Sequence, residues 1–327
     1  MPSVISKRFA ALAFLSGMLL GGVLLFFGIG REEAVDQPAL LAFAPQQEEK
    51  ATLVFVGDMM FDRHIRSVLE ARGAEHVLGS VAPLLRESDL TVGNLEGPVT
   101  EYPSVSQGSK VGDITNMRFT FATSVPQMLA SYGFDLVSLG NNHMLDFGGE
   151  GALATKQWLT NAGLSFVGDP TEMTPEAVTK EVNGIQVAFI GYNDFFGRTA
   201  DETRSFIRST KALEQPDQIV VLAHWGAEYL PEPPERVREL GRSFVDAGAD
   251  LVIGSHPHVV QPYEDYRGAR IYYSLGNFVF DQYWTETVRC GELVTVSLEK
   301  TDGATLASYS ETEVGMRTDG STALGCI

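Results

Sequence analysis

The stretch DLVIGSHPH, residues 250–258, places an apolar run directly before two histidines. The run has the length and the β-branched composition of a buried strand, so His256 and His258 are expected just past the end of that strand. Pro257 bends the chain between them, which lets both imidazoles converge on one point. Because a purely structural reason for two histidines at such a place is rare, a metal site is the favoured interpretation.

Six further runs of this kind lie along the chain, and amphipathic stretches separate several of them. The runs are TLVFVGD (52–58), DLTVGNLE (89–96), DLVSLGNNH (135–143), QVAFIGYND (186–194), IVVLAHWG (219–226) and RIYYSLGNF (270–278). The amphipathic stretches are SVPQMLASYG (124–133), GALATKQWLTNAG (151–163) and ERVRELGRSFVDAG (235–248). This alternation predicts a layered α/β fold with sheet covered on both faces. The stretch ELVTVSLEK (292–300) is expected to add antiparallel strands.

Nearly every apolar run ends in glycine next to a residue that can bind a metal ion. In α/β sheets ligands bind at the carboxyl ends of strands, where the loops of several strands meet. Carboxylate, amide and imidazole groups together suit Zn, Mn or Fe better than Ca or Mg alone. The predicted metal ligands are Asp58, Glu96, Asn142, His224, His256 and His258, and Glu96 is placed to bridge two ions.

Simpler explanations exist for single pieces of this pattern. Gly-Asp after a strand is usually a turn, and GNLE alone is more often a turn with a solvated acid. In GNNH, Asn142, His143 and Asp146 behind them are interpreted as ligand, acid and orienting carboxylate, and Asn141 is a further possible site residue. The alternative is a hydrogen-bonded loop.

Four further residues carry two interpretations each. Asp62 and His64 lie where the first strand gives way to a helix, and they either complete the site or are ordinary residues of the early helix. Glu228, four residues after His224, and Asn277, near the last strand, either line the crevice or pack in loops.

The composition limits the classes of partner. With 327 residues, 44% of them hydrophobic, the chain is long enough to bury a large core. Its formal net charge of -18 and the lack of a basic stripe exclude nucleic acid as a partner. The same negative field repels an anionic substrate unless bound cations or a local basic pocket reverse its sign at the site, which makes a metal site worth looking for.

The first residues predict a membrane anchor. A charge-free run extends over residues 9–29 after Lys7 and Arg8, which is long enough for one transmembrane helix and longer than the apolar part of a cleaved signal. The basic pair places the amino terminus inside and the remaining chain outside the cell. The alternative is a cleaved signal, since residues 42–44, Ala-Phe-Ala, imitate a cleavage site. The expected division is an anchor over 1–31, a linker over 32–50, a domain over 51–300 and a C-terminal strand or tail over 301–327.

The chain has two cysteines, Cys290 and Cys326. They could pair in an oxidising exterior, but two cysteines make no disulfide framework and no CxxC metal motif. The favoured interpretation is that they are structurally incidental.

The motifs GDMMFDRH, GNLEGPV, FDLVSLGNNHMLDFG, LAHWGAEY, GSHPHVVQP and YSLGNFVFD, in this order, resemble the CapA family. These are poly-γ-glutamate capsule biosynthesis proteins, related to the calcineurin-like metallophosphoesterases, and the resemblance covers about residues 51–285. It implies a four-layer αββα sandwich of the metallophosphoesterase type with a dinuclear metal site. It also implies a role at the bacterial cell surface in making, exporting or anchoring a γ-linked glutamate polymer.

The resemblance also assigns roles to single residues. It implies Asp58 as the first metal carboxylate, Glu96 in place of the usual bridging aspartate, and His143 as the group that assists the leaving group. The remaining ligands that it implies are Asn142, His224, His256 and His258. This sequence departs from the pattern at one point. The phosphoesterases begin with Asp-x-His, whereas GDMM has no histidine two residues after Asp58. Either Asp62 or His64 takes the place of that histidine, or one metal ion is held more weakly.

Three functions follow from these observations. The favoured one is a membrane-anchored CapA-like hydrolase with two divalent ions, which acts on an anionic polymer or a phosphoester. The second is a non-hydrolytic protein that binds, guides or tethers nascent polymer beside a membrane synthase, and the missing histidine favours it. The third is a metal-dependent phosphodiesterase or phosphatase for small substrates.

Overall fold

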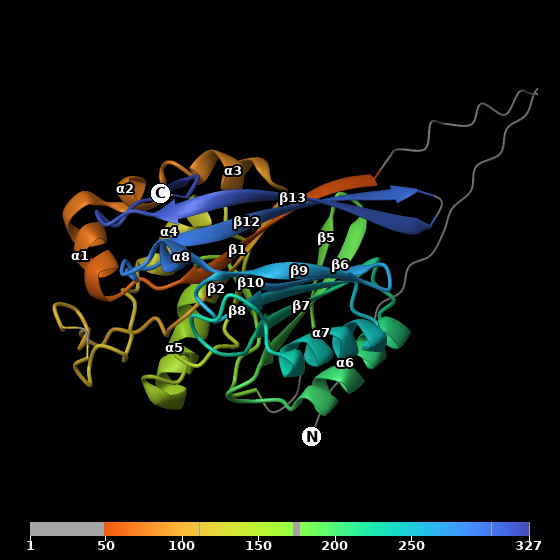
Figure 1. The fold of residues 1–327 in the computed structure, drawn as a ribbon, viewed down its shortest axis with the longest axis horizontal. Helices are drawn as coiled ribbons and strands as arrows, with labels where there is room; N and C mark the ends of the chain where they lie inside the picture. Colours follow the sequence, from red (N-terminus) through yellow and green to blue (C-terminus); the bar gives the residue numbers. More distant parts are fainter. Residues whose placement is uncertain (1–48, 111, 173–176, 302, 327) are drawn as a thin grey trace, which may run out of the picture. The chain divides into compact units, whose positions relative to one another are not determined.

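The computed structural model describes residues 49–326 except 111, 173–176 and 302, and these residues form two β-sheets with flanking helices (Figure 1). The strands of the first sheet are β1 (Glu49–Met59), β2 (Leu90–Leu95), β3 (Leu136–Ser138), β4 (Ser165–Val167), β11 (Asn277–Val279), β12 (Cys290–Thr301), β13 (Ala304–Met316) and β14 (Thr322–Leu324). Their order is β14-β13-β12-β1-β2-β3-β4, and β11 pairs with β1. From β1 to β4 neighbouring strands are parallel, whereas β12, β13 and β14 are antiparallel.

The second sheet has a parallel centre and antiparallel edges. Its strands are β5 (Val178–Val182), β6 (Ile185–Asn193), β7 (Gln218–His224), β8 (Leu251–Ser255), β9 (Val260–Tyr266) and β10 (Ala269–Leu275), in the order β5-β6-β7-β8-β10-β9. The strands β6, β7, β8 and β10 run parallel, while β5 and β9 are antiparallel to their neighbours.

Helices cover the outer face of each sheet. On the first sheet these are α1 (Arg63–Arg72), α2 (Ala74–Leu78), α3 (Ala82–Glu87), α4 (Val125–Ser131) and α5 (Gly148–Asn161), which share one apolar cluster with it. On the second sheet, α6 (Ala200–Leu213) and α7 (Glu235–Ala247) share another cluster with the strands. The short helix α8 (Glu286–Arg289) leads into β12.

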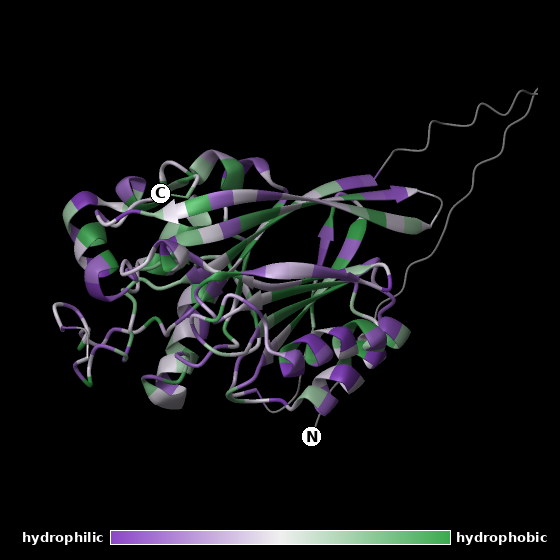
Figure 2. Ribbon diagram, in the orientation of Figure 1, coloured by the Kyte–Doolittle hydropathy of each residue, from purple (hydrophilic) through white to green (hydrophobic). Residues whose placement is uncertain are grey.

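A third apolar cluster lies between the two sheets. In β1 the side chains alternate, so that Leu53 and Phe55 belong to this inner cluster while Val54 and Val56 face the helices of the first sheet. Because successive side chains of a strand point to opposite faces, a run that is apolar at every position fits a strand buried on both sides. Figure 2 shows mostly hydrophobic residues on the inner strands and many hydrophilic residues on α6 and α7.

The predicted α/β class is therefore confirmed, and the described residues form two sheets. Each of the seven apolar runs coincides with a strand, and the three amphipathic stretches coincide with α4, α5 and α7. The stretch 292–300 forms part of β12, which is antiparallel to β1 as predicted.

The two sheets meet where the chain leaves β10. The amide of Asp58 donates to the carbonyl oxygen of Gly276 at 3.0 Å, and a Cβ at Gly57 would collide with this same oxygen. Residue 57 is therefore a glycine because the backbone of the crossing segment passes over it.

Cys290 and Cys326 form a disulfide, so the interpretation of both as incidental was wrong. The bond joins the start of β12 to the end of the described chain, just past β14. The predicted membrane anchor over residues 9–29 lies outside the described residues. Within the described part of the chain, no helix has the length and apolar character needed to cross a bilayer.

Candidate metal centre

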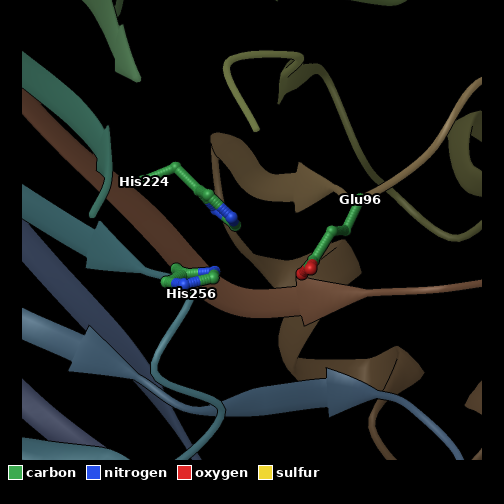
Figure 3. A group of neighbouring side chains, drawn as sticks. All are labelled: Glu96, His224 and His256. Carbon is green, nitrogen blue, oxygen red and sulfur yellow. The ribbon is translucent and has the colours of Figure 1, made fainter. Parts of the chain in front are cut away.

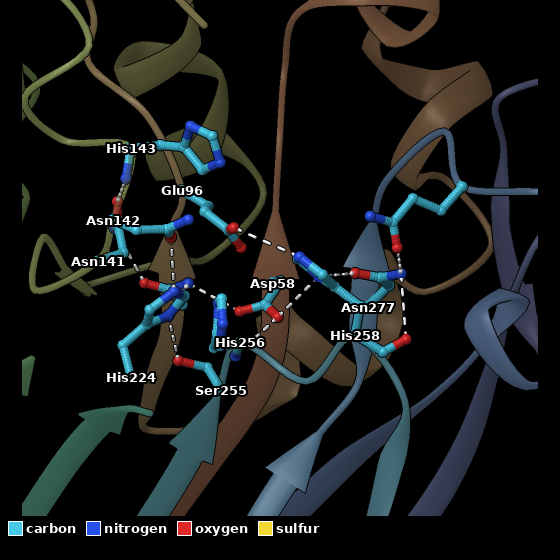
Figure 4. Close-up of polar contacts among 12 residues, drawn as sticks. Asp58, Glu96, Asn141, Asn142, His143, His224, Ser255, His256, His258 and Asn277 are labelled. Carbon is cyan, nitrogen blue, oxygen red and sulfur yellow. Dashed lines mark hydrogen bonds and ion pairs between the residues drawn. The ribbon is translucent and has the colours of Figure 1, made fainter. Parts of the chain in front are cut away.

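Strand ends of both sheets bring the predicted ligands together (Figure 4). In the first sheet Asp58 of β1 lies in register with Asn94 of β2 and with Asn277 of β11. In the second sheet His224, the last residue of β7, lies in register with Ser255 of β8. Because both sets of parallel strands end on the same side of the molecule, residues far apart in sequence face one another there.

Two groups of ligand atoms share one carboxylate. The ligand atoms of Asp58, Glu96 and His258 all lie within 4.8 Å of one another, and so do those of Glu96, His224 and His256. Figure 3 shows the side chains of the second group pointing toward a common centre. Glu96 follows β2 directly and belongs to both groups, as a carboxylate that bridges two ions would.

Both carboxylate oxygens of Glu96 are buried without a hydrogen-bond partner among the described residues. Burial raises the pKa of this carboxyl well above its ordinary value of 4.5, and the neighbouring carboxylates of Asp58 and Glu228 raise it further. A charged group in this state is costly unless a cation compensates for it. The surroundings of Glu96 are therefore suited to a bound metal ion.

Two histidines of the centre, His224 and His256, have lowered pKa values. Burial lowers the pKa of His224 well below 6.5, and neighbouring His256 and His258 lower it further. Burial, followed by His258, lowers the pKa of His256 to about 4. Neutral imidazole is the form that binds metal ions, and Nδ1 of buried His256 has no hydrogen-bond partner in the described structure.

The backbone at the two closing histidines is unusual. His256 has a φ of 97° and His258 a φ of 56°, and both therefore lie in the left-handed region that residues with a side chain rarely adopt. Such conformations cluster at functional sites, where the surrounding structure enforces them. Here the backbone N–H of His256 donates to Oδ2 of Asp58 at 3.1 Å, which links this loop to β1.

Second-layer hydrogen bonds orient the candidate ligands. Nδ1 of His258 lies 2.9 Å from Oδ1 of Asn277, so that Nε2 points toward Oε1 of Glu96, 3.6 Å away. Nε2 of His224 lies 2.9 Å from Oδ1 of Asn142, and both atoms can approach one ion. Partners of this kind select the tautomer and the ring orientation of a metal ligand. Asn277 therefore lies where it can orient the ring of His258.

Asn94 and Ser255 have roles that the sequence analysis missed. Nδ2 of Asn94 donates to Oδ1 of Asp58 at 2.7 Å, and Oγ of Ser255 lies 2.9 Å from Nδ1 of His224. Asn94 stands in the box GNLE and Ser255 in the box GSHPH. Their closeness in sequence to a predicted ligand is the signal that could have identified them.

His143 and Asp146 form a pair at the edge of the centre. Nδ1 of His143 lies 2.9 Å from Oδ2 of Asp146, which also accepts the backbone N–H of Phe119 at 2.7 Å. The ring of His143 packs on that of Phe119, with the centroids 4.2 Å apart. Asn141 holds the same loop, because its Nδ2 donates to the carbonyl oxygen of Leu95 at 2.8 Å and its Oδ1 accepts the N–H of His143.

Asp62 and His64 belong to none of the ligand groups found among the described residues. Asp62 is the N-cap of α1 and accepts the backbone N–H groups of Arg63 and Thr120 at 2.9 and 2.8 Å. His64 is exposed at the start of the same helix, with its ring near Tyr283. The structure thus places both residues at the helix start, outside these ligand groups.

Glu228 lies on the other side of the centre. One of its carboxylate oxygens forms a third group with nitrogen atoms of His256 and His258, again within 4.8 Å. Glu228 is half-exposed, in the loop after β7. It is therefore the candidate ligand nearest to solvent.

Comparisons with known proteins agree with the motif pattern. The sequence model of the family described as "Bacterial capsule synthesis protein PGA_cap" matches residues 52–282. The PGA biosynthesis protein CapA of Bacillus subtilis (strain 168) is 36% identical over 75% of this chain and 67% of its own length. The capsule biosynthesis protein CapA of Bacillus anthracis is 34% identical over 74% of this chain and 62% of its own length.

Solved structures similar to the fold are more distant. TT1561 of Thermus thermophilus has a TM-score of 0.42 at 10% identity, over 74% of this chain and 93% of that one. The purple acid phosphatase PPD1 from yellow lupin has a TM-score of 0.38 at 12% identity, over 82% of this chain and 52% of that one. The match to residues 52–282, together with more than 30% identity to two CapA proteins, shows that the chain belongs to the CapA-like bacterial capsule synthesis protein family PGA_cap.

Proposed function

We propose that the chain is a membrane-anchored, extracytoplasmic CapA-like protein of poly-γ-glutamate capsule biosynthesis with a dinuclear metal hydrolase site. One observation carries the hydrolase part: Glu96 belongs to two ligand groups, and both of its buried oxygens lack a hydrogen-bond partner in the described structure. Two separate groups with one common carboxylate are the arrangement that two neighbouring ions need.

In this proposal Asp58, Glu96 and His258 would hold one ion, and Glu96, Asn142, His224 and His256 would hold the other. When bound, a pair of Mn, Zn or Fe ions supplies a water of lowered pKa and a clamp for the oxygens of an in-line displacement.

His143 is the proposed proton donor to the leaving group. Asp146 lies at Nδ1 of its ring, which leaves Nε2 as the atom that delivers the proton. Phe119 packs on the ring and restricts its rotation.

Other observations support the remaining parts of the proposal. Two packed sheets with helices outside are consistent with the four-layer αββα sandwich of metallophosphoesterases. The disulfide fits an oxidising, extracytoplasmic location, and the apolar run 9–29 is the proposed single-pass anchor. A membrane polymer synthase complex is the proposed partner, with the anionic polymer or a phosphoester as substrate.

Metal analysis of the purified full chain in detergent tests the proposal. Wild type is expected to contain about two equivalents of a divalent transition metal. A His256→Ala/His258→Ala variant should lose this metal, whereas His64→Ala, with an exposed histidine outside the ligand groups, should retain it. Circular dichroism establishes that each sample is folded.

A second measurement separates metal binding from hydrolysis. His143→Ala should keep the metal and lose hydrolysis of bis(p-nitrophenyl) phosphate, because His143 is absent from the ligand groups of the described residues. Folded wild type without metal after supplementation with Mn or Zn would contradict the hydrolase site. The non-hydrolytic role, binding nascent polymer beside a synthase, would then be the better account.

A further inference from the structure

A cavity of about 600 Å³ adjoins the candidate metal centre. Glu228 belongs both to its wall and to the third ligand group. Tyr229 lines the same wall, and its ring centroid is 6.1 Å from that of His258. A molecule in this cavity therefore reaches the metal centre directly.

The walls of the cavity carry little positive charge. Arg63 is the only arginine or lysine among the described residues that line it, whereas Glu228 and Asp281 are acidic. In a chain with a formal net charge of -18, a local cation in this wall favours the approach of an anionic substrate to the metal centre. Arg63 is the side chain that can provide it.

Arg63 is held between two aromatic rings that lead to the centre. Its guanidinium carbon lies 4.9 Å from the ring centroid of Phe119 and 5.5 Å from that of Phe280. Phe119 packs on His143, and Phe280 packs on His258 with the centroids 4.8 Å apart. The guanidinium thus lies one aromatic ring away from the proposed proton donor and from a candidate metal ligand.

The hydrogen bonds of Arg63 are incomplete. The residue is only 9% exposed, and its Nε has no hydrogen-bond partner in the described structure. One terminal nitrogen lies 3.2 Å from Oδ1 of Asn116, and the other is paired with Asp281. A buried ion pair with unsatisfied donors contributes little to stability, so packing alone does not explain an arginine here.

The backbone of Arg63 is also strained. Its φ is 48°, at the first residue of α1, where most residues with a side chain adopt a negative φ. Strain of this kind is maintained at sites where the position of a side chain matters for function.

We propose that Arg63 binds a phosphoryl oxyanion of the substrate in this cavity, and that Asp281 is its counter-ion when no substrate is bound. The inference rests on the proposed metal centre, since the ions and Arg63 would hold the same anion from two sides. The guanidinium group matches phosphate oxygens with two parallel hydrogen bonds. Ser67, Gln282 and half-exposed Trp284 of the same wall are available for the remainder of the phosphoester.

Calorimetric titration with inorganic phosphate tests the inference on the metal-loaded full chain. Arg63→Met is expected to weaken phosphate binding by roughly 10- to 100-fold, the effect of losing hydrogen bonds to a charged group. Asp281→Asn should bind phosphate several-fold more tightly, because it releases Arg63 from its counter-ion. Arg72→Met, an exposed arginine at the end of the same helix, should bind like wild type.

The outcomes separate the two proposals. Metal content is measured on the same samples, and a folded wild type without metal contradicts the proposed function. Equal phosphate affinity of wild type and Arg63→Met at equal metal content overturns the inference alone. Should Arg63→Met fail to fold, Asp281→Asn decides, since unchanged or weaker phosphate binding by this variant also overturns it.

Discussion

Replacing Glu96 by glutamine is expected to stabilise the metal-free protein, although the same change removes the shared ligand of the candidate centre. The carboxylate is fully buried and both of its oxygens lack hydrogen-bond partners in the described structure. Asp58→Asn is the matched comparison, because Asp58 is equally buried but accepts hydrogen bonds from Asn94 and from the backbone of His256. Both variants should lose metal, and their metal-free forms should shift stability in opposite directions.

The magnitude follows from the cost of unpaired buried groups. An unsatisfied buried group costs about 1–3 kcal/mol, and a charged group costs more than a neutral one such as the amide of glutamine. Burial raises the pKa of the Glu96 carboxyl well above 4.5. The stability that the protonated carboxyl provides is therefore complete below pH 4.5, and it is lost as the pH rises through the raised pKa. At pH 8 Glu96→Gln should therefore gain about 1–3 kcal/mol over metal-free wild type. Asp58→Asn should lose about 1–3 kcal/mol, because it replaces a charged acceptor.

Thermal unfolding in EDTA and then in Mn²⁺ measures these effects. At about 2 °C per kcal/mol for a domain of this size, metal-free Glu96→Gln should melt about 2–6 °C above wild type. Wild type should gain about 2.7 kcal/mol when the free metal concentration is about 100 times Kd, and neither variant should gain as much. A metal-free Glu96→Gln that melts below wild type at pH 8 would refute the reasoning, because it would mean that the carboxylate is already compensated.

Three further predictions concern positions away from the shared ligand. The Cys290–Cys326 disulfide closes a loop with a sequence separation of 36. Its reduction should lower the free energy of unfolding by about 3–4 kcal/mol. Equal urea midpoints with and without reductant would contradict this. Burial, with the neighbouring Glu311 and Glu313, raises the pKa of Glu292 to about 7. Wild type should therefore lose stability as the pH rises through 7, and Glu292→Gln should melt at a higher temperature than wild type at pH 8. Melting temperatures of the two proteins that change in parallel from pH 5 to 9 would exclude this. Asp62→Ala should lower the free energy of unfolding in urea by about 1–3 kcal/mol, because the α1 cap and the hydrogen bond from Thr120 are lost. The metal content should stay unchanged. Loss of metal from a folded sample would mean that Asp62 contributes to the metal centre.

Much of the fold was predictable because its signals are local. Nearly every predicted strand is an apolar run with glycine near its end, and each of the predicted helices has an apolar period, so neighbouring residues suffice to identify them. The predicted ligands stand at the same strand ends, and parallel strands bring such ends together.

Other features depend on contacts between distant segments. Asp62 caps α1 through a local hydrogen bond from Arg63, but the hydrogen bond that it accepts from the backbone of Thr120, 58 residues away, depends on the tertiary structure. The cysteines pair because β13 carries the chain back along β12, so that the end of the chain returns to Cys290. Their spacing alone matched no disulfide pattern.

The sequence by itself determined the α/β class, the family resemblance and the set of polar side chains at the strand ends. Only the tertiary structure decided that Glu96 is common to two ligand groups, that Glu228 joins His256 and His258, and that Arg63 lines the adjoining cavity. The physical reason is that strand runs and caps are properties of a few neighbouring residues. Distances between ligand atoms instead depend on how two sheets pack, which is the sum of many weak contacts across the whole chain.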